Sequence, residues 1–221
     1  MFRLSINKLN NLKATGMFLV AFFVFSNSYN VSAQSNLSRF FKLSCPEKRW
    51  VFFHPFIAAG SFTISREASE KAIELKSDTS LDGDLNGGQL DAFRHAYWMA
   101  LVTQKYGWRK AYTLGKAHEK GNYKDYKKHR TEDGTFPDEQ SCQMDFLNND
   151  AGIQTGKDNP MATSEEITKK IKDQIINGKL FIIKKDKNGR FLKCNGEIIL
   201  PEELKGKWKT PKCIVESNIK K

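Results

Sequence analysis

The sequence predicts a mainly α-helical (α+β) protein, with a compact helical domain and a small C-terminal β hairpin. Three observations carry this prediction. Apolar residues recur at helical spacing through residues 64–177. Two short apolar runs in residues 179–200 flank Asp186-Lys187-Asn188-Gly189, which is typical of a hairpin turn. The chain has 221 residues, of which 39% are hydrophobic, so it can bury a core and is not wholly disordered.

Residues 1–33 have the pattern of a secretory signal peptide. Arg3, Lys8 and Lys13 precede an apolar run over residues 17–25, and residues 31–33 (VSA) suit a signal peptidase. The run is shorter than the roughly 20 residues that span a bilayer, so a membrane anchor is the weaker alternative. We expect cleavage after residue 33 and a periplasmic or secreted chain with no later transmembrane segment. Removing three basic residues lowers the formal charge from +11 to +8.

Residues 34–63 form an aromatic N-terminal segment. The run Trp50-Val51-Phe52-Phe53-His54-Pro55-Phe56 is too apolar to lie free in water. Proline biases the residue before it toward an extended backbone. We therefore expect a strand or coil that packs on the helical body.

The helical core domain, residues 64–177, is expected to hold five helices and one polar loop over residues 120–136. The second helix is apolar on all sides past His95, which predicts a central, buried position. A Thr or Ser cap and a closing glycine bound the last helix. The expected helices are residues 65–76, 90–106, 108–119, 138–154 and 163–177.

Residues 178–221 form a basic β-hairpin extension. From residue 165 to the end the sequence has 15 Lys or Arg and 8 acidic residues. This excess is typical of a solvated face, and it also suits contact with an anionic surface or polymer. Nucleic acid is the weaker partner, because the lysines lack an interleaved pattern of stacking aromatics.

The four cysteines agree with export. Cys45, Cys142, Cys194 and Cys213 all follow the cleavage point, and an exported compartment favours disulfides. Four cysteines allow three pairings. We favour Cys194 with Cys213 and Cys45 with Cys142, which leaves no thiol. A zinc site made from all four is the alternative, but the sequence has no C-x2-C pair.

Polar side chains on apolar helix faces are the main indication of a site. Burying such groups is costly unless they pair with one another, bind a ligand or face a cleft. We expect them to form one connected cluster between three helices, either a structural network or a functional site. The seven residues are Asp91 and His95, then His118 and Glu119, then Asp145, Asn148 and Asn149.

The residue types in this cluster suggest specific roles. His95 and His118 suit proton transfer or metal ligation, because imidazole titrates near neutral pH. Glu119 and Arg94 join them as catalytic candidates, with Arg94 able to hold a phosphate or carboxylate. Two histidines with a carboxylate suit zinc, whereas carboxylates with amides suit calcium. The candidate metal ligands are Asp91 and Asp145, and the candidate binding residues are Asn148, Asn149 and Trp98.

A second candidate metal site precedes the central helix. Asp82, Asp84 and Asn86 follow the D-x-D-x-N-G start of a calcium-binding loop. Position 12 of such a loop needs a bidentate glutamate, and Phe93 stands there. A glycine-rich turn with Asp and Asn caps is the alternative interpretation.

The polar helices also resemble a known family. The pattern AFRHAYW from residue 92, AHE from residue 117 and MDxxNNxxG from residue 144 is similar to a bacterial family of unknown function. That family occurs in secreted proteins and at the ends of toxin-like polypeptides. The resemblance covers about residues 50–155 and implies a helical domain with a polar centre, but no reaction. The common form has His where Leu147 stands, which removes one possible ligand.

Two functions follow from these patterns. The first is an exported hydrolase that activates water, assisted by a zinc or calcium ion, and acts on a phosphoester, lipid or similar anionic substrate. The sequence has no G-x-S-x-G elbow, and oxidised cysteines cannot act as nucleophiles. The Asp-x-x-Arg-His helix beside a calcium-like loop loosely resembles small secreted phospholipases. The second is a non-catalytic exported binding protein with a structural polar network.

Overall fold

The computed structural model describes residues 40–131 and 136–219, and the expected signal peptide, residues 1–33, lies outside them. The chain divides into a unit Met1–Leu43 and a unit Ser44–Lys221. Only residues 40–43 of the first unit are described. Everything below concerns the second unit. Over the residues described, no helix combines the length and apolar character needed to cross a membrane.

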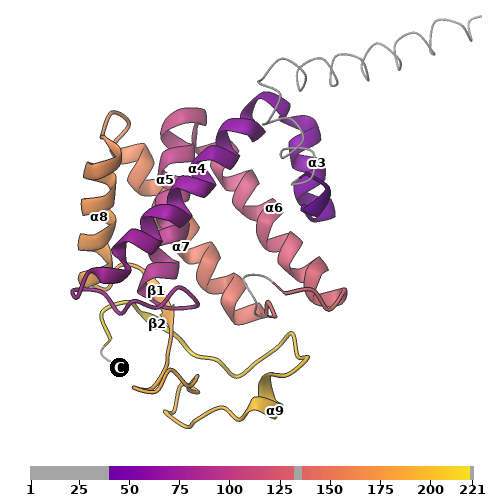
Figure 1. Ribbon diagram of the computed structural model, residues 1–221, viewed down its shortest axis with the longest axis vertical. Helices are drawn as coiled ribbons and strands as arrows, with labels where there is room; N and C mark the ends of the chain where they lie inside the picture. The colour runs from indigo at the N-terminus through magenta and orange to yellow at the C-terminus, as the bar shows by residue number, and fades with distance from the viewer. Residues whose placement is uncertain (1–39, 132–135, 220–221) are drawn as a thin grey trace, which may run out of the picture. The chain divides into compact units, whose positions relative to one another are not determined.

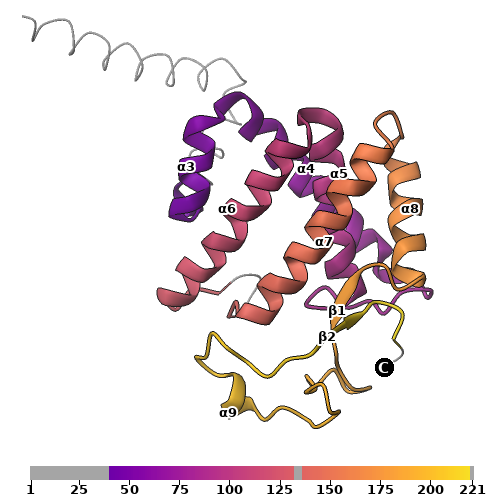
Figure 2. The same cartoon turned by 180° about the vertical axis from the view of Figure 1, so that it is seen from behind.

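The second unit is mainly helical and carries one small antiparallel sheet, which confirms the predicted fold class (Figures 1 and 2). The sheet pairs two three-residue strands, with Ile182 opposite Val215. The helices and strands of the second unit, in chain order, are α3 (Cys45–Phe53), α4 (Pro55–Glu74), the 3-10 helix η1 (Leu75–Ser77), α5 (Gln89–Tyr106), α6 (Trp108–Lys127), α7 (Glu139–Asp158), α8 (Ser164–Ile176), β1 (Phe181–Ile183), α9 (Pro201–Leu204) and β2 (Ile214–Glu216).

Helix α5 is the centre of the core, as its all-round apolar sequence predicted. It packs against α4, α6, α7 and α8, and most of its residues are buried. Its closest partner is α7, where a Cβ atom on Gly152 would lie 2.1 Å from the carbonyl oxygen of Ala96. Gly156 meets Ala100 in the same way. The two pairs follow the same order along both helices, so α5 and α7 run parallel with their backbones in contact.

The expectation of a strand or coil in the aromatic N-terminal segment was wrong for the part described from residue 45. Ser44 caps α3 through a capping box with Glu47, and Pro55 occupies the first turn of α4. Proline is favoured there because the first helical N–H groups have no partner within the helix. His54 alone leaves the helical conformation, with φ −136°. Trp50 is buried and donates to Thr113 Oγ1 at 3.0 Å.

The remaining helices follow the predictions, with one correction. α7 begins directly after its N-cap Asp138, which was expected as the first residue of that helix, and α8 is capped by Thr163, one of the two predicted caps. Helix α6 runs to Lys127, so it includes the first half of the loop predicted over residues 120–136. Asn122 and Gly121 are buried on that added length, which explains why a polar sequence there continues as helix.

The predicted C-terminal hairpin forms in part: Lys185 and Phe191 pair across the turn, but the expected strand partner of β1 was wrong. The turn at Asp186 forms, because its carboxylate accepts from the backbone of Asn188 and Arg190. However, β1 pairs with β2 and not with residues 190–192. The backbone N–H of Lys184 donates to the carbonyl of Cys213, so the C-terminal strand takes the position expected for the returning arm. Residues 190–192 keep isolated bridges only.

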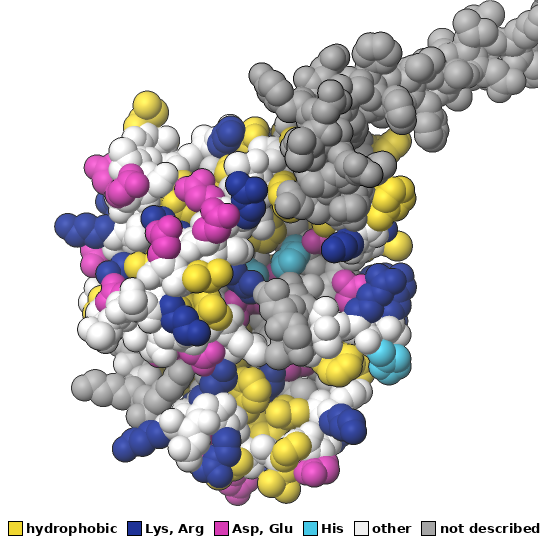
Figure 3. Space-filling view, viewed as in Figure 1, with side chains coloured by type: hydrophobic (Ala, Val, Ile, Leu, Met, Phe, Trp, Pro, Cys, Tyr) yellow, Lys and Arg dark blue, Asp and Glu magenta, His cyan; other side chains and the backbone are white. Residues whose placement is uncertain are grey.

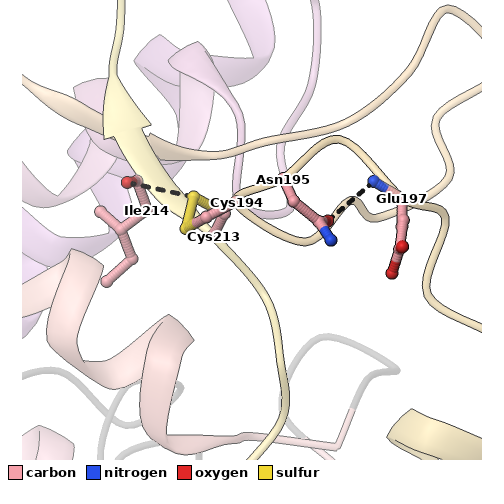
Figure 4. Close-up of a disulfide and its surroundings, with 5 residues drawn as sticks. All are labelled: Cys194, Asn195, Glu197, Cys213 and Ile214. Carbon is pink, nitrogen blue, oxygen red and sulfur yellow. Dashed lines mark hydrogen bonds between the residues drawn. A yellow bond between two sulfur atoms is a disulfide. The ribbon is translucent and has the colours of Figure 1, made fainter.

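One of the two expected disulfides is present. Cys194 and Cys213 are bonded across 19 residues and close the segment that leads from the turn to β2 (Figure 4). Cys45 and Cys142 remain thiols, so the expectation of a fully oxidised chain was wrong. Cys45 is exposed at the start of α3, which packs on α6 and α4, whereas Cys142 is buried in the first turn of α7.

Candidate functional site

The first turns of α5 hold a buried ion pair. Asp91 Oδ1 lies 2.7 Å from Arg94 Nη2, and Asp91 Oδ2 accepts from the backbone N–H of Gly87 at 2.7 Å. The side chain of Asp91 is 9% exposed and that of Arg94 is 24% exposed. Because an acidic side chain near a helix N-terminus is favoured by the helix dipole, this position suits an ionised Asp91.

His95 lies between two carboxylates from different helices. Its Nε2 is 3.4 Å from Asp145 Oδ1 on α7 and 3.8 Å from Asp91 Oδ1 on its own helix. Its Nδ1 is 3.3 Å from Asn149 Oδ1, also on α7. An amide oxygen can only accept, so Nδ1 carries the proton and Nε2 faces the carboxylates. This arrangement holds the ring in the orientation that a ligating histidine uses.

Asp91, His95 and Asp145 together have the geometry of a metal-binding set. One ligand atom from each lies within 4.8 Å of the other two, and all three residues are buried. Metal–ligand bonds of about 2.1 Å would place neighbouring ligand atoms roughly 3.4 Å apart in a tetrahedron. Asp91 and Asp145 bring two carboxylates to this point, and carboxylates are common ligands of divalent cations. The donor set of one imidazole and two carboxylates suits zinc, manganese or iron.

A histidine–glutamate pair, His118 on α6 and Glu47 on α3, lies next to this set. His118 Nδ1 is 3.0 Å from Glu47 Oε1, and the two side chains are 21% and 19% exposed. The ring centroids of His118 and His95 are 6.2 Å apart. Burial raises the pKa of Glu47, but the hydrogen bond and charge of His118 and the cap at Ser44 outweigh it, so the net pKa is lowered. Glu47 is therefore held as a carboxylate.

Two buried N–H groups next to the histidines have no hydrogen-bond partner within residues 40–131 and 136–219. They are Trp98 Nε1 and Asn149 Nδ2. The indole of Trp98 meets the ring of His118 edge-on at 5.4 Å, and Asn149 contacts His95 through its oxygen. An unsatisfied buried donor costs about 1–3 kcal/mol. Groups left in this state are suited to receive oxygen atoms of a bound ligand.

Two further predicted site residues, Asn148 and Glu119, make hydrogen bonds outside this group. Asn148 is fully buried, and its amide exchanges two hydrogen bonds of 2.9 Å with the backbone of Phe181. It thereby anchors β1 on α7. Glu119 is buried and accepts from Asn122 on the same helix at 3.2 Å. The structure thus gathers Asp91, Arg94, His95, Asp145 and Asn149, with the ring of His118 alongside.

The calcium-like loop before α5 is organised around a lysine. Asp82 Oδ1 accepts from the backbone of Asp84 and Gln89. Asp84 Oδ2 pairs with Lys185 Nζ at 2.7 Å, and the same ammonium donates to the carbonyl of Asn86. The side chain of Lys185 is 6% exposed. An ammonium group therefore sits against two of the three expected calcium ligands, which favours the capped-turn interpretation.

Sequence reasoning missed Glu47 and Lys185. The capping pattern Ser44-x-x-Glu47 was visible in the sequence and predicts a helix start. Its pairing with a histidine 71 residues away was not visible. Lys185 belonged to a run of lysines that is typical of a solvated face, and nothing local distinguished it from its neighbours.

Residues 48–179 match the profile of a family described as a domain of unknown function (DUF6973). The match includes α4 to α8 and most of α3, and it ends before β1. No curated protein and no solved structure matches the chain.

Proposed function

The chain belongs to the DUF6973 family of domains of unknown function, and we propose that it is an exported, metal-assisted hydrolase of a phosphoester or a similar anionic substrate. The observation that carries the proposal is the convergence of Asp91, His95 and Asp145 within 4.8 Å in a buried position. Next to them, the partly exposed pair of His118 and Glu47 offers a base that a substrate can reach.

Each group has a distinct role in this proposal. A divalent ion held by Asp91, His95 and Asp145 would act as a Lewis acid toward the substrate and its attacking water. His118, oriented through Nδ1 by Glu47, accepts the water proton at Nε2 as the new P–O bond forms. The same proton then passes to the leaving alkoxide as the old P–O bond breaks. This is the base–orienter arrangement found across acid–base catalysts.

The anionic character of the substrate rests on the donors around the histidines. Arg94, which pairs with Asp91, is partly exposed, and its fork of N–H groups matches phosphate oxygens. The N–H groups of Trp98 and Asn149, which have no hydrogen-bond partner among the described residues, add two neutral donors. The oxygen atoms of a phosphate would accept hydrogen bonds from both.

Export is part of the proposal. The Cys194–Cys213 disulfide supports it, because disulfides persist in oxidising compartments, and so does the signal-peptide pattern of residues 1–33. Edman sequencing of the secreted or periplasmic protein should find residue 34 first.

The enzyme proposal is tested with purified protein and two probes. Elemental analysis should find about one equivalent of a divalent transition metal, and hydrolysis of bis(p-nitrophenyl) phosphate should stop after chelation and return on adding the metal. Asp145→Asn should abolish both metal retention and turnover, whereas Asp158→Asn on the exposed end of the same helix should change neither. Full turnover in metal-free protein would contradict the metal-assisted mechanism.

A non-catalytic binding protein is the second candidate, favoured by one observation in the C-terminal extension. A cavity of about 250 Å³ lies there between apolar and lysine side chains, among them Ile182, Leu192, Lys184 and Lys187. Figure 3 shows hydrophobic and basic side chains side by side over this part of the molecule. Such a surface suits an anionic amphiphile. Co-sedimentation with phosphatidylglycerol vesicles, but not with phosphatidylcholine vesicles, would support it.

A further inference from the structure

Two buried lysines of the C-terminal extension meet at one aromatic ring. Lys185 Nζ lies 4.8 Å and Lys212 Nζ 4.1 Å from the ring centroid of Phe191. Their side chains are only 6% and 9% exposed. Lysine is rarely buried unless its charge is paired, so both ammonium groups must have fixed partners. We call these three residues the lysine clamp.

Each lysine of the clamp pairs with an aspartate at the start of one site helix. Lys185 Nζ is 2.7 Å from Asp84, in the loop that leads into α5. Lys212 Nζ is 2.5 Å from Asp138, the N-cap of α7. Because α5 and α7 run parallel, the two aspartates lie at the same end of the helix pair. The clamp therefore joins the N-terminal ends of the two helices that carry Asp91 and Asp145.

The path from Lys185 to Asp91 is short and hydrogen-bonded throughout. The backbone carbonyl of Asp84 accepts from the N–H of Asp91, and the N–H of Gly87 donates to Asp91 Oδ2 at 2.7 Å. The carbonyl of Gly87 accepts from Ile183 of β1 at 2.7 Å. Displacing Lys185 would thus move the loop that orients the carboxylate of Asp91.

The path from Lys212 to Asp145 runs along α7. Asp138 accepts from the backbone N–H of Ser141 at 2.9 Å and caps the helix. The next residue, Glu139, donates its N–H to the carbonyl of Trp208 at 2.9 Å. Asp145 lies two turns further on. The extension therefore sets where α7 begins and, through the rigid helix, where Asp145 lies.

We propose that Lys185 and Lys212 are positioning residues, which act through Phe191 to set the distance between the carboxylates of Asp91 and Asp145. The contacts of Gly152 with Ala96 and of Gly156 with Ala100 fix the point at which α5 and α7 cross. The clamp fixes how far apart the N-terminal ends of the two helices lie, on the side of the site. The clamp lies beyond residue 179, where the family match ends, so this chain's own extension adjusts the shared domain. The metal readout rests on the proposed function; the structural readout does not.

The test uses the full chain without its signal peptide and three methionine variants, which keep side-chain length and remove charge. Lys185→Met and Lys212→Met remove one arm of the clamp each, and Lys209→Met, exposed in the same extension, is the matched control. The dissociation constant for Zn²⁺ alone is measured by calorimetry. Hydrogen exchange of the Gly87 amide is measured by NMR on metal-free protein.

The clamp predicts a specific pattern of losses. Both arm variants should bind Zn²⁺ at least about tenfold more weakly, and Lys209→Met should match the wild type. In Lys185→Met the Gly87 amide should exchange at least about tenfold faster, because its acceptor Asp91 is no longer held in place. Lys185→Arg keeps the charge and should restore most of this protection.

Other results of the same measurements would contradict the clamp or the metal-assisted function separately. Arm variants that melt at lower temperature but keep wild-type Zn²⁺ affinity and Gly87 protection would reduce the clamp to a stabilising contact and overturn the proposal. A wild-type chain that binds no Zn²⁺ would end the metal-assisted function, while the Gly87 exchange would still decide the clamp. If Lys185→Met does not fold, Phe191→Leu, which keeps both ion pairs, should give weaker losses in the same direction.

Discussion

The two histidines of the candidate site differ in burial, partners and surroundings. His95 is 3% exposed and faces two carboxylates and an amide. His118 pairs with the carboxylate of Glu47, and its side chain is 21% exposed. A histidine enclosed by fixed acceptors suits holding a charge or a metal, whereas one that solvent reaches suits passing a proton. The same residue type therefore takes two roles within 6.2 Å.

The α5–α7 half of the site, which carries His95, and the α3–α6 half, which carries His118 and Glu47, also differ in how closely their helices pack. In the α5–α7 half, an added Cβ on Gly152 would meet backbone atoms of Ala96. In the α3–α6 half, an added Cβ on Gly121 would meet the hydroxyl of Ser44, a small side chain. Backbone cannot move without shifting a whole helix, but a serine can rotate. We conclude that the His95 half is rigid and the His118 half is adaptable.

The largest effect is expected from removing His95. His95→Ala leaves two buried carboxylates with one arginine and should lower the free energy of unfolding by about 3–5 kcal/mol. Urea denaturation of metal-free protein at pH 7 measures this. His129→Asn, in the exposed turn that follows α6, should change stability by no more than about 0.5 kcal/mol. Equal values for both variants would remove the distinction between a buried and an accessible histidine.

His118→Ala should give the opposite pattern. Loss of the general base should lower kcat about 10²- to 10⁴-fold. The free energy of unfolding should fall by only about 1 kcal/mol, because a partly exposed ion pair adds little stability. Steady-state kinetics on bis(p-nitrophenyl) phosphate, paired with urea denaturation, separates the two. A large loss of stability with unchanged kcat would make His118 structural.

Substitutions of Gly152 and Gly121 test the difference in packing between the two halves of the site. Gly152→Ala should destabilise the protein by about 1–3 kcal/mol, because the α5 backbone must shift. Gly121→Ala should cost about 1 kcal/mol, chiefly through the Ser44 cap, and should lower kcat because the cap helps hold Glu47. Thermal unfolding and kcat are measured on both. If the ranking is reversed, the α5–α7 half is not the rigid one.

The smallest effect concerns pH. Because the pKa of Glu47 is lowered from 4.5 in the folded state, its stabilisation is complete above about pH 4.5 and is lost as the pH falls through the lowered pKa. Glu47→Gln should flatten this acid limb, with a difference of roughly 1 kcal/mol between pH 5 and pH 3. Urea denaturation at these two pH values checks it. Parallel curves for both proteins would show that the carboxylate is not held by His118.

The helices and the polar faces of this site could be predicted because they follow from local pattern. The all-round apolar α5 and the capped α8 have a period and an end that the sequence displays. α3 and the first half of α4 were missed because a dense aromatic run shows no clear period, and Pro55 looked like an interruption when it starts a helix. Several of those aromatics, Phe52, Phe53 and Phe56, are more than 60% exposed.

Long-range pairing explains the other failures. Asp91 and His95 share a helix face by spacing alone, so their neighbourhood was predictable. The partners Glu47 and Lys185 reach the site across 71 and 101 residues, and only the folded chain brings them there. The expected partner of β1 was wrong for the same reason. Ile182 of β1 pairs with Val215 of β2, 33 residues further along the chain, and not with the nearby residues 190–192.

The position of β1 and the last strand has a consequence for the order of folding. Gln89 at the start of α5 donates to the carbonyl of Ser217, a separation of 128 residues, and the side-chain amide of Asn148 bonds to the backbone of Phe181. A nascent chain therefore cannot complete these contacts at the base of its central helix before residues 181 and 217 have left the ribosome. Loop closure over such distances slows folding.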